Sequence, residues 1–170
     1  GWDSPWGKGR PGWHLECSAM SEKYLGKEFD IHGGGLDLIF PHHENEIAQS
    51  TCANETDLLA KFWMHNGYVT VNKEKMSKSD GNFITIHELK DKFDGQVIRL
   101  AMLSTHYTQP FDWNNQILEN SYKSLNKWYD FYSDEDETID PSLLDSLKDD
   151  LNTPLFISQL HKLHQEAIEG

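Results

Sequence analysis

Two lysines, Lys75 and Lys78, are the residues whose spacing most directly suggests chemistry. They lie in the segment Lys75-Met76-Ser77-Lys78-Ser79, which continues into Asp80-Gly81-Asn82. Two ammonium groups in a small polar loop suit a mobile clamp for a polyphosphate, because each can follow the negative charge that develops on a leaving pyrophosphate. A solvated turn is the alternative for such a loop taken alone. The motifs upstream favour a catalytic role for both lysines.

A second group of residues has the composition of a metal site. His42 and Glu46 are four residues apart, so on a helix they project from the same face. Cys17 would come from a neighbouring helix. Thiolate, imidazole and carboxylate together suit Zn²⁺. The alternative is a small buried cysteine beside a helix-surface hydrogen bond. We predict that Cys17, His42 and Glu46 bind one zinc ion.

Tetrahedral zinc needs a fourth ligand. The chain offers four spare donors, none with an obvious spacing to complete the set: His14, His32, His43 and Cys52. We predict that Cys52 is a core residue, because it lies well round the helix from Glu46. Sequence beyond this chain remains as a source of the fourth ligand.

A glycine run follows a predicted strand. Gly33-Gly34-Gly35 lets the backbone approach a ligand closely, because no Cβ intervenes. Asp37, two residues on, suits hydrogen bonds from ribose hydroxyls. Trp13 and His32 would flank the mouth of such a site. A plain turn for the glycines, and simple packing for Trp13 and His32, are the alternatives.

The elements that must position these residues change character along the chain. Residues 1–12 are loop-like, and the first part is α/β, with a boundary near 110–118 before a helical remainder. The predicted helices span 14–25, 42–52, 87–93, 96–104, 114–132, a segment opened by Pro141, and 155–169, whereas the predicted strands span 29–32 and 63–71. Pro141 and Thr153-Pro154 are typical helix openers.

Composition narrows the class of protein. The 170 residues carry a formal net charge of −13, which argues against nonspecific nucleic-acid binding through overall charge. The span from 130 to 150 holds −8 of this charge, so the acidity belongs mostly to one exposed segment. Two cysteines are too few for a disulfide framework, which indicates a reducing, intracellular setting. No apolar run is long enough for a membrane span, and we expect no secretory leader.

Four motifs resemble those of the cysteinyl-tRNA synthetases. They are Gly9–Met20, Phe29–Gly35, Phe40–Glu46 and Lys75–Ser79, and together they lie within roughly the first 110 residues. Residues 150–154, Asp-Leu-Asn-Thr-Pro, resemble the start of that family's helical domain. The chain is on this basis similar to a class I aminoacyl-tRNA synthetase over part of its length.

The resemblance implies a fold and an activity. The fold would be α/β, the C-terminal half of a class I Rossmann-type catalytic domain over residues 1–112. An all-helical segment, the stem and the start of a helical bundle, would follow over 113–170. The activity would be ATP-dependent activation of cysteine and its transfer to tRNA(Cys), with zinc coordinating the substrate thiolate. The expected cofactor is one Zn²⁺ per subunit, with ATP as a substrate and Mg²⁺ beside it.

The resemblance also assigns roles to individual residues. Cys17, His42 and Glu46 match zinc ligands, Trp13 and His32 match the lining of the cysteine pocket, Gly35 and Asp37 match the ATP-side loop, and Lys78 matches the mobile lysine that contacts ATP. The expected protein is a cytoplasmic monomer without membrane contact.

The chain departs from the family pattern in two ways. The first zinc cysteine and the His-Ile-Gly-His-type motif are not in it, so we expect a piece of the enzyme that is inactive alone. Thr108 stands where an arginine is expected, which leaves a tRNA or substrate role at that position unsupported. Two alternatives remain: a related ATP-dependent cysteine ligase with an amino-sugar acceptor, and a non-catalytic metal- or nucleotide-binding module.

Overall fold

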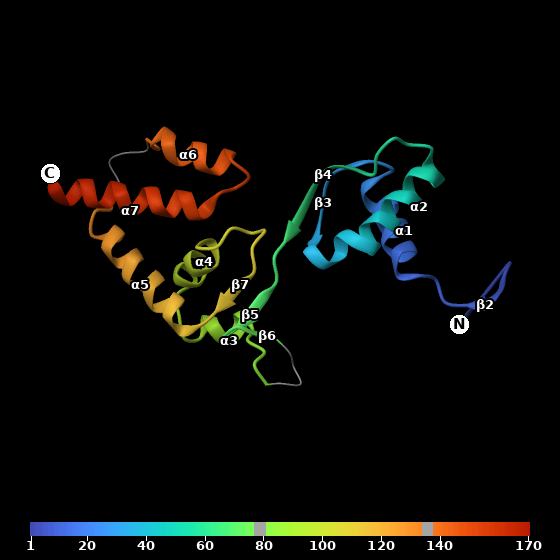
Figure 1. The fold of residues 1–170 in the computed structure, drawn as a ribbon, viewed down its shortest axis with the longest axis horizontal. Coiled ribbons are helices and arrows are strands. Elements are labelled where there is room, and N and C mark those ends of the chain that lie inside the picture. Colours follow the sequence, from blue (N-terminus) through green and yellow to red (C-terminus); the bar gives the residue numbers. More distant parts are fainter. Residues whose placement is uncertain (77–80, 134–137) are drawn as a thin grey trace. The chain divides into compact units, whose positions relative to one another are not determined.

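The computed structural model describes residues 1–76, 81–133 and 138–170. The chain divides into two compact units, Gly1–Asn66 and Gly67–Gly170. Each unit is described by itself, and its elements can be followed by colour in Figure 1. The domain boundary expected from the sequence, after residue 112, stays a prediction.

The first unit combines two helices with a pair of parallel strands. Its elements are β1 (Trp2–Ser4), β2 (Gly7–Gly9), α1 (Trp13–Leu25), β3 (Phe29–Gly35), the short helical turns η1 (Leu36–Leu38) and η2 (Ile39–His43), α2 (Glu44–Asn54) and β4 (Ala60–Asn66). Strands β1 and β2 form an antiparallel hairpin in a segment that we predicted to be a loop.

Strand β3 begins where predicted and runs on through the three glycines. It pairs in parallel with β4, from Phe29 opposite Ala60 to Gly35 opposite Asn66. Phe29 and Ala60 form a small buried cluster with Leu59. Because side chains alternate along a strand, one face of this pair carries His32 and Gly34 and the other carries Ile31. Ile31 is 58% exposed whereas His32 is partly buried, so beyond Phe29 the histidine face is the more buried one.

Helices α1 and α2 form as predicted and pack against each other. Helix α1 ends at Gly26, whose φ of 94° favours glycine. The helices meet through polar side chains: the buried Ser18 hydroxyl donates to Gln49 Oε1 at 3.0 Å. The prediction that Cys52 belongs to the core is wrong, because Cys52 is exposed. Glu46 and Ser50 define the buried face of α2, and Cys52 points away from it.

The second unit is built on a three-stranded sheet with helices around it. Its elements are β5 (Val69–Val71), β6 (Glu74–Lys75), α3 (Ile86–Lys90), α4 (Gly95–Leu103), β7 (Phe111–Trp113), α5 (Asn115–Tyr129), α6 (Pro141–Lys148) and α7 (Thr153–Glu169). The strand order is β6-β5-β7, and β7 pairs in parallel with β5. Strand β7 was not predicted from the sequence. The hydrophobic core of the second unit is formed by residues of β5, α4, β7 and α5, and Ala101 and Leu118 are among its buried side chains.

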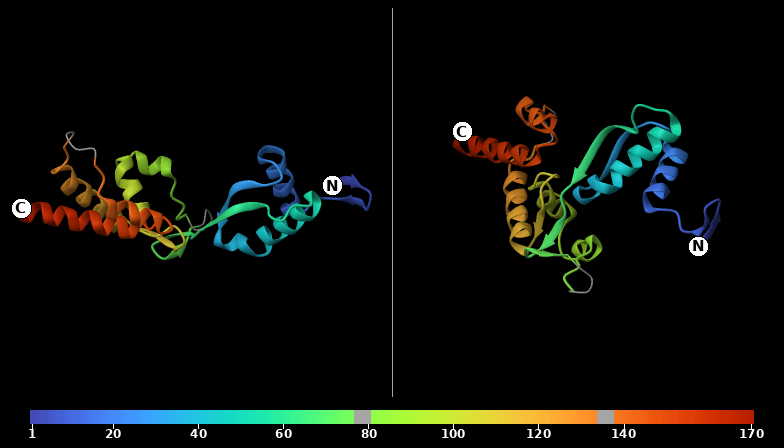
Figure 2. Two further views of the ribbon diagram at one scale, coloured as in Figure 1. Left: turned by 90° about the horizontal axis from the view of Figure 1, so that it is seen from above. Right: turned by 45° about the vertical axis from the view of Figure 1, so that its right-hand side comes forward.

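Side-chain caps explain where the later helices begin. Asn114 Oδ1 accepts from the Ile117 amide at 3.0 Å at the start of α5, and Asp140 Oδ1 accepts from the Ser142 amide at 2.8 Å at the start of α6. Asn152 does the same for α7. Pro141 opens α6 as predicted, whereas α7 begins two residues before the predicted Leu155 and is capped by Asn152 in place of Thr153. Figure 2 shows these helices from two further directions. Within the described ranges, no helix is both long enough and apolar enough to cross a membrane.

Candidate metal and substrate site

Three residues predicted as metal ligands converge in the first unit. Cys17 on α1, His42 in η2 and Glu46 on α2 each place one donor atom within 4.8 Å of the others'. His42 Nε2 lies 2.5 Å from Glu46 Oε1, as expected for residues four apart on a helical path. Glu46 is 1% exposed and His42 4% exposed. The donors therefore meet in a place shielded from water.

The buried Glu46 carboxylate suits a cation as a charge partner. In the described parts of the chain, no lysine or arginine forms an ion pair with the buried Glu46 carboxylate, and its two oxygens lie against the ring nitrogens of His32 and His42. Burial raises the pKa of the Cys17 thiol, and the nearby Glu46 charge raises it further. A divalent cation between these groups would compensate the buried carboxylate and favour the thiolate. The residues present thus fit zinc.

Glu46 also belongs to a second group of donors. Its other carboxylate oxygen, Oε2, lies 2.5 Å from His32 Nε2, and one donor atom each of His32, His43 and Glu46 lies within 4.8 Å of the others'. The carboxylate therefore connects the predicted ligand His42 with the predicted pocket residue His32. The structure thus brings three predicted site residues, Cys17, His32 and His42, around a fourth, Glu46.

Two further histidines complete this network. His14 Nδ1 lies 2.8 Å from His42 Nδ1, and His43 Nδ1 lies 2.8 Å from His65 Nε2. Burial lowers the pKa of His43, and the neighbouring His32 lowers it further, which favours a neutral ring. A hydrogen bond between two ring nitrogens needs one donor and one acceptor, so in each pair the tautomer of one ring fixes that of its partner. A metal ligand is commonly oriented in this way through its other nitrogen.

Aromatic rings frame the cluster. Trp13 lies with its ring centroid 4.1 Å from that of His42 and is 58% exposed. Trp63 on β4 contacts His32 edge-on at 4.7 Å and His43 at 5.2 Å. The sequence analysis missed Trp63 and His65. They lie two residues apart on one strand, and that spacing was the available signal.

The glycine run has a structural use beside its predicted one. A Cβ on Gly34 would lie 2.8 Å from His43 Cε1 and 3.0 Å from Leu38 Cδ1, so only glycine lets the His43 ring pack against β3. Gly35 ends β3 and is followed by Asp37 in η1, whose side chain is exposed. Contact of Gly35 and Asp37 with a nucleotide stays a prediction.

A known protein family matches most of this chain. The family model described as "tRNA synthetases class I (C) catalytic domain" matches residues 1–123. The chain belongs to this class I tRNA synthetase family. The resemblance seen in its sequence motifs is thereby confirmed.

Three curated relatives of this chain share one name. The "Cysteine--tRNA ligase" of Pelagibacter ubique is 58% identical over 171 residues, which cover 99% of this chain and 38% of the relative. The "Cysteine--tRNA ligase" of Afipia carboxidovorans is 57% identical, over 100% of this chain and 37% of the relative. The "Cysteine--tRNA ligase" of Rhizobium meliloti is 58% identical, over 98% of this chain and 37% of the relative. The chain thus spans less than two fifths of the length of these relatives.

A solved structure shares the fold. The LeuRS of Agrobacterium radiobacter K84, in a ternary complex with tRNA and LeuAMS, superimposes with a TM-score of 0.58 at 16% identity. The match covers 84% of this chain and 23% of that one. Likeness at this identity shows the fold alone, which is that of a class I catalytic domain with mixed helices and strands.

The lysine segment of this family member is described only at its start. Lys75 belongs through its backbone to β6, where it pairs with Thr70. Lys78 lies outside the described residues. The catalytic roles of both lysines stay predictions.

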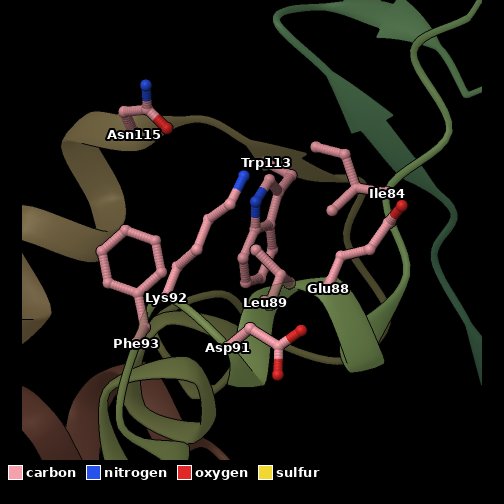
Figure 3. Close-up of a pocket in the computed structure, with 8 residues that line it drawn as sticks. All are labelled: Ile84, Glu88, Leu89, Asp91, Lys92, Phe93, Trp113 and Asn115. Atoms are coloured by element: carbon pink, nitrogen blue, oxygen red, sulfur yellow. The ribbon is translucent and has the colours of Figure 1, made fainter.

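The second unit also contains a cavity of about 370 Å³ (Figure 3). Its lining is mixed, with apolar rings beside charged groups: Ile84, Glu88, Leu89, Asp91, Lys92, Phe93, Trp113 and Asn115. In Figure 3 the Lys92 side chain extends alongside the Trp113 ring. Among the described residues, none that was predicted for the site lines this cavity.

Proposed function

We propose that the full-length protein activates cysteine with ATP and transfers it to tRNA(Cys). The observation that carries this proposal is the convergence of Cys17, His42 and Glu46 within 4.8 Å. A sulfur, an imidazole and a carboxylate in one buried cluster are a zinc-binding set. The name shared by relatives at 54–58% identity supports the substrate.

Cys17, His42 and Glu46 would hold the zinc ion. When bound, zinc supplies a Lewis acid that prefers sulfur to oxygen and so separates cysteine from serine, which an apolar pocket rejects only weakly. His14 orients the His42 ring through the contact between their Nδ1 atoms. Trp13 and His32 would bound the place of the amino acid, and the low exposure around Glu46 excludes water from it.

The ATP side would be formed by the glycine run and the lysine segment. Gly35 and Asp37 would contact the nucleotide, with Mg²⁺ on its phosphates. The cysteine carboxylate would attack the α-phosphate, so that the bond to the β-phosphate breaks and pyrophosphate leaves. Lys75 and Lys78 would stabilise the charge that the leaving pyrophosphate gains, and this interaction is stronger in the transition state than in the ground state.

The wider context follows from the same proposal. Residues 1–112 would be the C-terminal half of a Rossmann-type catalytic domain, and 113–170 the stem and the start of a helical bundle. The protein would act as a cytoplasmic monomer. The acidic segment would lie away from the tRNA, because like charges repel.

Three measurements on the full-length protein test the proposal. Cysteine-dependent exchange of pyrophosphate into ATP should exceed that with serine by at least a hundredfold, and tRNA(Cys) should become charged with cysteine. Bound zinc should be present at one per chain. Exchange without any preference for cysteine, or a cysteinyl amide of an amino sugar as the only product, would contradict it.

A further inference from the structure

The turn before the lysine segment is held by a side chain from another strand. Asp112 on β7 accepts two hydrogen bonds with Oδ1, from the Thr70 hydroxyl at 2.7 Å and from the Lys73 amide at 2.5 Å. Its Oδ2 accepts from Asn114 Nδ2 at 3.2 Å. One carboxylate therefore connects the central strand β5, the β5–β6 turn and the start of α5.

The turn that receives this support has an unfavourable backbone. Asn72 and Lys73 have φ angles of 51° and 66°, a left-handed conformation that a residue with a Cβ rarely adopts. Asparagine tolerates it, whereas lysine offers no side-chain compensation. The hydrogen bond from the Lys73 amide to Asp112 supplies a partner that this conformation needs. The Asn72 amide is held in a similar way by the Trp113 carbonyl at 3.2 Å.

The hairpin itself is too short to fix its own register. Strand β6 has only two residues, which pair as Thr70 with Lys75 and Val71 with Glu74. Thr70 is at the same time the partner of Asp112 in the parallel pairing. Thr70 is thus both the residue whose hydroxyl Asp112 binds and the residue that pairs with Lys75 in the antiparallel ladder.

The charge state of Asp112 agrees with this arrangement. The hydrogen bonds from Thr70 and from the Lys73 amide lower the pKa of its carboxyl group. It is therefore ionised at neutral pH and makes charge-assisted hydrogen bonds, which are stronger than neutral ones.

We infer that Asp112 is a positioning residue for the start of the lysine segment: by holding the Asn72–Lys73 turn, it fixes the register in which β6 pairs with β5, and with it the backbone position of Lys75. The catalytic part of this inference rests on the proposed function. The register itself does not, because it is a property of the fold.

The kinetic test compares Asp112→Ala, Asp112→Asn and a matched control in the full-length protein. Asp140→Ala is the control, because Asp140 is also an aspartate that accepts a backbone amide, at the start of α6. Asp112→Ala should lower kcat of pyrophosphate exchange by about ten- to a hundredfold, the scale of a small misplacement of catalytic groups. KM for cysteine and zinc content should stay unchanged. Asp112→Asn should recover most of kcat, because its amide oxygen still accepts both hydrogen bonds.

Hydrogen exchange of the Lys73 amide gives a second readout that needs no activity. It should be at least tenfold faster in Asp112→Ala and unchanged in Asp140→Ala, while amides of α5 stay protected in all variants. An unchanged kcat, no recovery in Asp112→Asn, or an unchanged Lys73 amide would overturn the inference. A wild-type protein without exchange activity would instead overturn the proposed function, and the Lys73 amide would still decide whether Asp112 holds the turn.

Discussion

His43 Nδ1 lies 2.8 Å from His65 Nε2, so two rings from different elements of the first unit share one hydrogen bond. His43 ends η2 and His65 belongs to β4. The contact links the helix that carries Glu46 to the parallel strand pair, and it does so beside the candidate ligands. The geometry of the cluster therefore depends on the fold of the whole first unit.

The two cysteines should differ sharply in their effect on bound metal. Cys17→Ser removes the only soft donor of the candidate trio and should lower bound zinc at least tenfold, because a hydroxyl is a poor zinc ligand. Cys52→Ser is the matched control, since Cys52 is exposed. Metal analysis of the purified variants measures this. Equal zinc in both variants would refute the assignment of Cys17.

His14 should matter for metal affinity without being a ligand. His14→Ala removes the nitrogen that faces His42 Nδ1, and loss of such an orienting partner typically lowers metal affinity by about 10- to 100-fold. Competition with a chromogenic chelator measures the affinity. His87→Ala, which changes an exposed histidine of α3, should leave it unchanged. An affinity that is the same in both variants would show that His14 does not orient His42.

Two adjacent glycines should respond differently to a methyl group. Gly34→Ala places a Cβ 2.8 Å from the His43 ring, and such overpacking costs about 1–3 kcal/mol in the free energy of unfolding. At Gly33 the nearest atom, the Met64 carbonyl oxygen, is 3.5 Å away, an ordinary contact. Gly33→Ala should therefore be the milder change. Urea unfolding of both variants measures the difference, and a larger loss at Gly33 would speak against the packing role of Gly34.

The contribution of Asp112 to stability should depend on pH. Its hydrogen bonds lower its pKa in the folded state, so its contribution is present above the unfolded-state pKa of about 3.9 and is lost as pH falls through the folded pKa. Asp112→Asn, which cannot ionise, should be less stable than the wild type at pH 7. The difference should shrink as the pH is lowered below about 4, as followed by urea unfolding. If the difference in free energy of unfolding between the wild type and Asp112→Asn grew on acidification, the prediction would be contradicted.

Local patterns predicted much of the fold. Helical spacing placed His42 and Glu46 on one face, and the prolines Pro141 and Pro154 marked the first turns of α6 and α7. These signals work because each depends on a few neighbouring residues. The same locality accounts for the correct position of β3.

Features set by distant contacts escaped the sequence analysis. Strand β7 has only three residues, and its pairing with β5 bridges about forty positions of the chain. His65 and Trp63 join the cluster through the register of β4 against β3, which no local pattern encodes. Cys52 was predicted to be a core residue because it lies well round the helix from Glu46, although that side of α2 is exposed to solvent.

The parallel register of β3 and β4 limits how this region can evolve in length. His32 stands opposite Trp63, and Gly34 stands opposite His65. One residue gained or lost at the start of β4 would rotate Trp63 and His65 to the side of Phe62, which is 66% exposed. Insertions and deletions should consequently be tolerated between Glu55 and Leu58, which lie outside both α2 and β4. Within β4 they should disrupt the cluster and be selected against.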